Sequence, residues 1–344
     1  MNLAWRRWRA LARLGPTADP FGTAEWSLAL VLVLLAVVVV SSLHGSADLA
    51  LPEWPAALFS VDHPYHAVLT EVRLPRVVAG SLVGAALAVA GALLQTAVRN
   101  PLADPSLLGV TAGAGLGAMI AILFRPEAPG ALPLAALGGG LGGAVAVVAA
   151  AGLGRGRSGP LRLVLAGVGL QALLFSAVAL LTFFFADRAP AFVAFTVGSL
   201  SGAGWNDVRT ATLLVVPALL GAVALSRSLD VLHLDEDSAA GVGLSVARTR
   251  LVVCGLAAAL AAGAVCVAGL VGFVGLMVPN ALRIALGPSH ARLVPLSAVG
   301  GASLVVGADW IARTLASPLE LPVGALLAVL GGPYLIYLLW TRIP

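Results

Sequence analysis

Ten apolar segments, separated by short polar stretches, are the feature that most restricts how this chain can fold. The hydrocarbon core of a bilayer is about 30 Å thick, and about twenty apolar residues of α-helix cross it. Inside lipid, a helix satisfies its own backbone hydrogen bonds. The pattern therefore predicts an all-α polytopic membrane protein with about ten transmembrane helices. The predicted spans are 26–43, 77–97, 106–124, 131–153, 163–186, 210–226, 251–268, 270–287, 293–312 and 323–341.

Composition leads to the same class. Hydrophobic residues make up 60% of the 344 residues and charged residues only 10%. This chain has too few polar residues to cover the surface of a water-soluble protein of its length. The isoelectric point of about 9.8 is attributed to arginines that orient the chain in the bilayer. Nucleic acid is therefore not an expected partner.

Three segments need a specific interpretation. Residues 251–287 would form a helix of roughly 54 Å, too long for a bilayer, so the glycines of "AGLVGFVG" are taken to divide it. Residues 191–205 are apolar but too short to span, and they can re-enter only under protein or water cover. We expect residues 1–25 to be a cytoplasmic tail and 26–344 a single transmembrane domain. A cleaved signal peptide is the alternative for the first apolar run.

Arginine placement predicts the orientation. All twenty basic residues are Arg. With the N-terminus inside, fourteen arginines lie in inner segments and six in outer ones, as the positive-inside rule prefers. We therefore expect both termini in the cytoplasm. The six outer arginines are Arg73, Arg76, Arg125, Arg188, Arg209 and Arg313.

Several kinds of chemistry are disfavoured. A Walker A loop needs a lysine and the chain has none, so any ATP must be hydrolysed by another subunit. Cys254 and Cys266 lie within one apolar run and are interpreted as small core residues, not a metal or disulfide pair. An intramembrane hydrolase would need a histidine base in a span. The five histidines fall outside the predicted spans, with His44, His63 and His66 outer and His233 and His290 inner.

The stretch "QTAVRNPLADPSLLGVTAGAGLGA" at residues 95–118 interrupts the apolar pattern abruptly. Asn100 precedes Pro101, which disfavours helix at that point, and Pro105 suits the start of the next helix. This stretch predicts a tight inner turn between two spans.

The same stretch, with the residues before it, carries a resemblance. "RLPRVVAGSLVGAALAVAGALLQTAVRNPLADPSLLGVTAGAGLGA", "LDEDSAAGVGLSVARTR", "GLVGFVGLMVPNALRIALGPSHARLVPLSAVGGASLVVGADWIAR" and "LELPVGALLAVLGGPYLIYLL" resemble the permease subunits of ABC importers for ferric siderophores, haem and vitamin B12 (FecCD-type). The resemblance covers the chain after residue 70. It implies the type II ABC importer permease fold.

The resemblance also implies an assembly in the cytoplasmic (inner) membrane. A second permease copy, two ATP-binding cassette ATPase subunits and an extracytoplasmic substrate-binding protein are the expected partners. ATP-Mg would be bound by the ATPases, and no cofactor or metal by this chain. Ferric siderophore is the first expected cargo, with haem and then cobalamin as alternatives. A proton-coupled secondary transporter is the distant alternative, and it leaves the outer arginines unexplained.

Three arginines are candidates for docking the binding protein. By the resemblance, Arg73 and Arg76 in "EVRLPR", with Arg313, receive acidic residues of that partner. Snorkelling to lipid headgroups is the alternative. Asp309 precedes Arg313 by four residues, so the two share a helical face. We expect Asp309 to orient or neutralise Arg313, and a proton relay is the alternative.

The polar segment 227–250 is the candidate for coupling to the ATPase. Asp235 and Asp237 precede "SAAGVG", a run suited to a short capped helix. The resemblance places the coupling helix here, and a merely solvated loop is the alternative. The contact candidates are Glu236, Asp237, Ala240, Gly241 and Leu244.

Other motif positions admit either a pathway or a packing role. Gln95, Thr111 and Gly113 are candidates for lining the pathway, although a polar residue between helices also serves packing. The family pattern has His after Pro in "GLxxPHxxR", whereas here Asn280 follows Pro279 and Arg283 is retained. Asparagine forms hydrogen bonds but does not titrate near neutral pH, so a role that needs an imidazole is not expected at this position.

Overall fold

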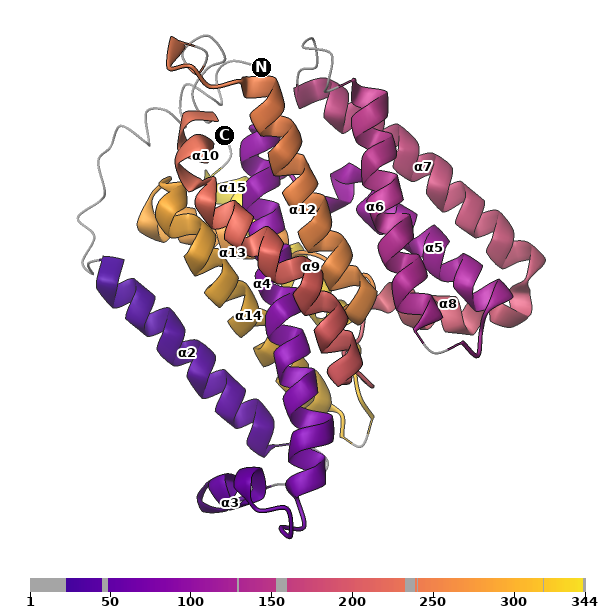
Figure 1. The fold of residues 1–344 in the computed structure, drawn as a ribbon, viewed down its shortest axis with the longest axis vertical. Coiled ribbons are helices and arrows are strands. Elements are labelled where there is room, and N and C mark those ends of the chain that lie inside the picture. The colour runs from indigo at the N-terminus through magenta and orange to yellow at the C-terminus, as the bar shows by residue number, and fades with distance from the viewer. Residues whose placement is uncertain are drawn as a thin grey trace.

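The fold comes from a computed structural model that describes residues 23–44, 49–128, 130–152, 160–232, 239, 241–317 and 319–342. These residues are mostly helical and include no β-strand (Figure 1). Each of the ten predicted spans corresponds to one helix, which confirms the all-α membrane architecture. The ten helices are α2 (Thr23–Leu43), α4 (Leu74–Val98), α5 (Val110–Phe124), α6 (Ala131–Ala151), α7 (Pro160–Phe184), α9 (Trp205–Ala224), α12 (Val246–Ala268), α13 (Val274–Leu286), α14 (His290–Leu315) and α15 (Val323–Arg342).

Seven helices of the described chain are long and apolar enough to cross a membrane. The other three, α5, α13 and residues Val323–Leu338 of α15, are shorter apolar helices. Residues 251–287 are divided as predicted, because α12 ends at Ala268 and Gly269 takes a positive φ of 67°. That left-handed conformation is open to glycine at little cost.

Short elements connect the spans. The first connection contains η1 (Leu51–Glu53) and α3 (Trp54–Phe59), and a π-helical turn (Val68–Arg73) leads into α4. The others are η3 (Pro105–Leu108), η5 (Ala186–Arg188), α8 (Ala189–Val197) and α10 (Ser226–Leu232). With nine residues, α8 is too short to span, as predicted for 191–205.

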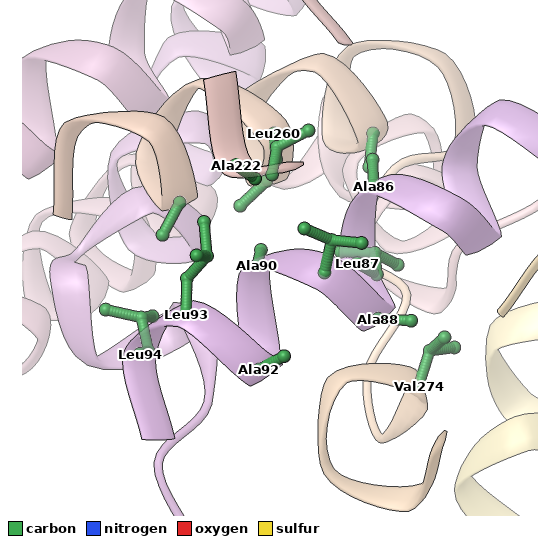
Figure 2. Close-up of a cluster of buried hydrophobic side chains, with 14 of the residues drawn as sticks. Ala86, Leu87, Ala88, Ala90, Ala92, Leu93, Leu94, Ala222, Leu260 and Val274 are labelled. Carbon is green, nitrogen blue, oxygen red and sulfur yellow. The ribbon is translucent and has the colours of Figure 1, made fainter. Parts of the chain in front are cut away.

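Helix α4 lies at the centre of the bundle, between α9, α12, α13 and α14 (Figure 1). Its alanine and leucine side chains pack among Ala222 of α9, Leu260 of α12 and Val274 of α13 (Figure 2). Of its 25 residues, 21 are buried, so α4 has almost no lipid-facing surface. In lipid there is no hydrophobic driving force for helices to associate. Their association depends on close packing, which small side chains allow.

Two glycine pairs set how closely α4 approaches its neighbours. A Cβ atom built at Gly84 would collide with the backbone of Gly301 in α14, and one at Gly91 would collide with Gly275 in α13. Any larger residue would therefore push the helices apart. Glycine at these positions is required by the helix–helix distance.

The turn after α4 forms as the sequence predicts. Arg99 takes the left-handed conformation (φ 54°) at the helix end, and the Asn100 amide donates to the Gln95 carbonyl at 3.0 Å. The Asp104 carboxylate caps η3 by accepting from the Ser106 amide at 2.9 Å. Burial raises the pKa of Asp104. Asn100, Pro101 and Pro105 are therefore turn residues, as predicted.

Candidate functional site

Charged side chains meet where α4 begins, and we call Arg73, Arg76, Asp309, Arg313 and Glu320 the Arg76 cluster. Asp309 of α14 is 3% exposed and lies between two guanidinium groups. Arg76 donates from Nε and Nη2 to its carboxylate at 3.0–3.2 Å, and Arg313 Nε lies 3.1 Å from Oδ2. The expected pairing of Asp309 with Arg313 is present, and Arg76 adds a second partner that sequence spacing could not reveal.

Glu320 closes the solvent side of this cluster. It lies in the connection between α14 and α15, with its side chain 44% exposed, and its Oε2 accepts from Arg76 Nη1 at 2.9 Å. Burial raises the pKa of Glu320, but the hydrogen bond and charge of Arg76 outweigh that effect and hold the pKa below its ordinary value. Sequence reasoning missed Glu320 because no local pattern connects it to Arg76.

The remaining two arginines of the cluster bind the end of α2. Arg73 Nη1 donates to the carbonyls of Ser42 and Leu43, both at 2.8 Å. Arg313 Nη2 donates to the Ser41 carbonyl at 3.1 Å and to its hydroxyl at 2.6 Å. Helix ends leave carbonyls without intrahelical donors, and these arginines supply them. The structure thus brings the three predicted docking arginines together, but buried; docking remains a prediction.

A second polar group lies at the other end of α4. Gln95 donates to the Gly275 carbonyl at 2.9 Å and accepts from Arg283 Nη1. Arg283 also donates to the Ala92 carbonyl at 3.3 Å. Gln95 therefore lies in the contact between α4 and α13. This position corresponds to the packing role, which was the alternative to lining the pathway. Arg283 therefore donates to acceptors on α4 rather than facing solvent.

Asp230, His290 and Thr96, which we call the His290 chain, join three helices beside this group. Asp230 of α10 accepts from the amide and from Nδ1 of His290 at 2.8 and 2.7 Å. His290 Nε2 lies 2.6 Å from the Thr96 hydroxyl of α4. Sequence reasoning left His290 in a loop, because the apolar pattern starts only at Leu293. Ser289 could have indicated that the helix starts at His290, because serine is favoured just before a helix.

The coupling segment (227–250) contacts the C-terminal end of α4 at two points. Arg99 Nη2 donates to the Leu232 carbonyl at 3.3 Å, where α10 ends. Arg250 Nε donates to the Ala97 carbonyl at 3.1 Å, in the second turn of α12. Of the predicted ATPase contacts, Gly241 is exposed and Leu244 donates to the Ala239 carbonyl. Glu236, Asp237 and Ala240 lie outside the described residues.

Asn280 connects α13 to the turn after α4. Its Nδ2 donates to the Pro101 carbonyl at 2.9 Å and to the Leu276 carbonyl, one turn back, at 2.8 Å. Pro279 lies within the same helix. The amide therefore performs a task that needs a hydrogen-bond donor and no titrating group.

A cavity of about 500 Å³ lies between α5, α12, α13 and α15. Asp104, Ser106 and Thr111 are the polar residues among those that line it, and the others are apolar. Gly113 borders a different apolar cavity of about 430 Å³ between α5, α6 and α7. Among the described residues, no group of three or more His, Cys, Asp or Glu side chains could hold a metal ion. Of the three pathway candidates, Thr111 is the one that borders the larger cavity.

Comparison with known proteins matches these features. The model of the FecCD transport family covers residues 32–341. The chain belongs to this family. A solved metal-chelate type ABC transporter in an inward-facing conformation superposes with a TM-score of 0.82 at 30% identity, covering 91% of this chain and 98% of the other. The family relationship confirms the ABC permease fold predicted from the sequence.

Curated relatives of the family carry different cargo names. The hemin permease HmuU of Yersinia pestis is 37% identical, over 91% of this chain and 94% of its own. The ferric dicitrate permease FecD of Escherichia coli is 38% identical, over 89% and 98%. The cobalamin permease BtuC of Halobacterium salinarum is 37% identical, over 84% and 80%. Similar identities to permeases of three cargoes support the transport role and leave the cargo unassigned.

Proposed function

We propose that this chain is the membrane-spanning permease of an ATP-driven importer that moves a bulky iron chelate into the cytoplasm, with ferric siderophore the first candidate. The observation that carries the proposal is the placement of two polar groups at opposite ends of α4. One contains the predicted docking arginines, and the other contacts the predicted coupling segment at Leu232 and Arg250. Hemin and ferric dicitrate, the cargoes named for two relatives, are both iron chelates.

The working unit contains a second permease copy, two ATPase subunits and a binding protein. Exposed apolar side chains of α7 and α15 provide surface for the second copy and for lipid. Unlike α4, these helices bury little of their surface in the described chain. Examples are Leu161, Leu173 and Phe183 of α7 and Val329, Ile336 and Trp340 of α15.

We infer the orientation from the distribution of arginines along the chain. Both termini face the cytoplasm when Arg99 after α4, Arg248 and Arg250 at the start of α12 and Arg283 near the end of α13 lie inside. The Arg76 cluster then faces the binding protein. Because Glu320 already occupies Arg76 Nη1, an acidic residue of that partner reaches this guanidinium by replacing Glu320. Charge pairing of this kind sets register and association rate.

The test is uptake by proteoliposomes that contain this chain, its ATPase and its binding protein. Ferric siderophore, hemin and cobalamin are offered in parallel, in the presence of either ATP or a non-hydrolysable ATP analogue. ATP-dependent accumulation of the ferric siderophore is the expected result. Accumulation of hemin or cobalamin instead would correct the cargo and keep the mechanism.

A proton-coupled secondary transporter is the competing function, and Asp309 was its candidate carboxylate. In the structure this carboxylate is held by Arg76 and Arg313, which favours a structural role. Uptake that needs no ATPase and follows an imposed proton gradient would contradict the ATP-driven proposal.

A further inference from the structure

Helices α4 and α14 run antiparallel and stay in one register along their contact. Arg76 pairs with Asp309, Gly84 meets Gly301, and Thr96 meets His290. One step forward along α4 corresponds to one step back along α14. Twenty residues separate the first and last of these α4 positions, which is roughly 30 Å of helix. The pair therefore joins the two faces of the membrane through one continuous contact.

The middle of this contact leaves little freedom for sliding or separation. At Gly84 and Gly301 the two backbones touch, with no side chain between them. Next to it, Gly80 faces Val305 and Val306 of α14. Close-packed interfaces transmit displacement because they have no voids to absorb it. We expect α4 and α14 to move as one body.

The His290 chain ties α10 to this pair through donors and acceptors that match one another. The Asp230 carboxylate can only accept, so His290 Nδ1 carries a proton, and the Thr96 hydroxyl forms the second hydrogen bond of the chain with Nε2. His290 and Thr96 are each 1% exposed, whereas the Asp230 side chain is 41% exposed. Hydrogen bonds in such a buried site are stronger than in water.

The position of α10 gives this connection its significance. Leu232, its last residue, is followed directly by residues 233–245 of the coupling segment. The segment returns through α12, where Arg250 binds Ala97. Leu232, Arg250 and the His290 chain thus all contact residues 96–99, at the C-terminal end of α4.

We propose that Asp230, His290 and Thr96 are positioning residues that transmit movement of the coupling segment to the α4–α14 pair, and so to the Arg76 cluster. The inference rests on the proposed ATP-driven function. A displacement of α10 by the ATPase pulls on α14 through His290 and on α4 through Thr96. The same two helices carry Arg76 and Asp309 at their far ends, where the binding protein would dock.

A hydrolytic role for the same three residues does not fit. Carboxylate, imidazole and hydroxyl occur in the order used by nucleophilic triads. However, the Thr96 hydroxyl is buried between helices and also bonds the Ala92 carbonyl of its own helix at 3.0 Å. A substrate has no approach to it.

The experiment compares Thr96→Val with Thr96→Ser in the reconstituted importer. Valine keeps the shape but removes the hydroxyl, and serine keeps the hydroxyl. The readout is cargo transported per ATP hydrolysed, measured together with the ATPase rate and the unfolding temperature. We expect Thr96→Val to lower this ratio about fivefold, the size of a modest coupling free energy, with ATP hydrolysis retained. Thr96→Ser is expected to restore the ratio.

Two further variants sharpen the test. Asp230→Ala should lower the ratio to a similar extent, and the double variant should lose no more than either single one, because they interrupt the same chain. Thr182→Val is the matched control, since the Thr182 hydroxyl bonds only the Val178 carbonyl within α7. The control should transport as the wild type does.

The outcomes separate the inference from the function on which it rests. Wild-type ATP-driven uptake together with an unchanged ratio in Thr96→Val would overturn the inference alone. Equal losses of transport, ATPase rate and unfolding temperature in both the valine and the serine variant would also overturn it, because they would mark a purely structural role. Absence of ATP-driven uptake by the wild type would overturn the proposed function as well.

Discussion

Arg76 and Asp309, 233 positions apart in the sequence, make three hydrogen bonds of 3.0–3.2 Å across the contact between α4 and α14. Both side chains are buried. Removing a charge from water is costly, and a buried pair offsets that cost only while both partners are present. Asp309 is the shared partner of two guanidinium groups, so the Arg76 cluster depends on it more than on either arginine.

Asp309→Asn is expected to destabilise the protein by about 3–5 kcal/mol, because it leaves buried arginines without their shared counter-charge. Thermal unfolding in detergent measures the change. Asp187→Asn is the control, since the Asp187–Arg188 pair is exposed and worth at most about 1 kcal/mol. Equal effects of the two substitutions would show that the Asp309 pair is not buried in the assembled protein.

The Glu320–Arg76 pair predicts a pH dependence. The pKa of Glu320 is lower in the folded protein than its ordinary value of 4.5. Its contribution to stability is therefore complete above pH 4.5 and is lost as the pH falls through the folded-state pKa. Glu320→Gln should unfold at a lower temperature than the wild type at pH 7, and the difference should shrink in acid. A difference that is constant down to pH 3 would contradict this assignment.

The same substitution tests the docking proposal. If an acidic residue of the binding protein must replace Glu320, then Glu320→Gln should strengthen binding of that protein to the permease. Affinity is measured at low and at high salt, because charge pairs of this kind weaken as salt rises. Weaker binding by the glutamine variant would instead make Glu320 itself a docking contact.

Gly84→Ala tests the backbone contact between α4 and α14. The new methyl group would collide with Gly301, and overpacking of this kind costs about 1–3 kcal/mol or more. Gly255→Ala is the matched control, because no other helix lies within 4 Å of the added carbon and alanine is the better helix former. Unfolding temperature and yield of both variants are compared. Wild-type stability of Gly84→Ala would mean that the helices are further apart than described.

Asn280→Ala should cost about 1 kcal/mol, because the Pro101 carbonyl loses its side-chain donor. Asn280→His restores a donor and should recover most of that loss. Thermal unfolding measures both variants. A histidine variant no more stable than the alanine one would show that the amide geometry, rather than donation alone, is needed here.

The sequence predicted the existence of the helices well and their ends less well. Helix α9 begins at Trp205 rather than 210, because the Asp207 side chain caps it through the Gly204 amide. Helix α12 begins at Val246 rather than 251. Its first turns contain Arg248 and Arg250, which lower local hydropathy, yet Arg250 is buried because the Ala97 carbonyl accepts from it.

The candidate site was predictable only where the relation was local. Asp309 and Arg313 are four residues apart on one helix, so their pairing follows from helix geometry. Arg76 and Glu320 come from other elements. Their contacts can be inferred only from how those elements align in the folded protein. The His290 chain was missed for the same reason, since it joins residues from α4, α10 and α14.

The burial of α4 has a consequence for how such a transporter can diversify. A helix surrounded by neighbours on every side accepts few single replacements, because each one needs a compensating change across a contact. Selection for a new cargo should therefore recover substitutions in cavity-lining residues of its neighbours, such as Thr111, Phe273 and Leu335. The central helix should remain nearly constant while the walls around it vary.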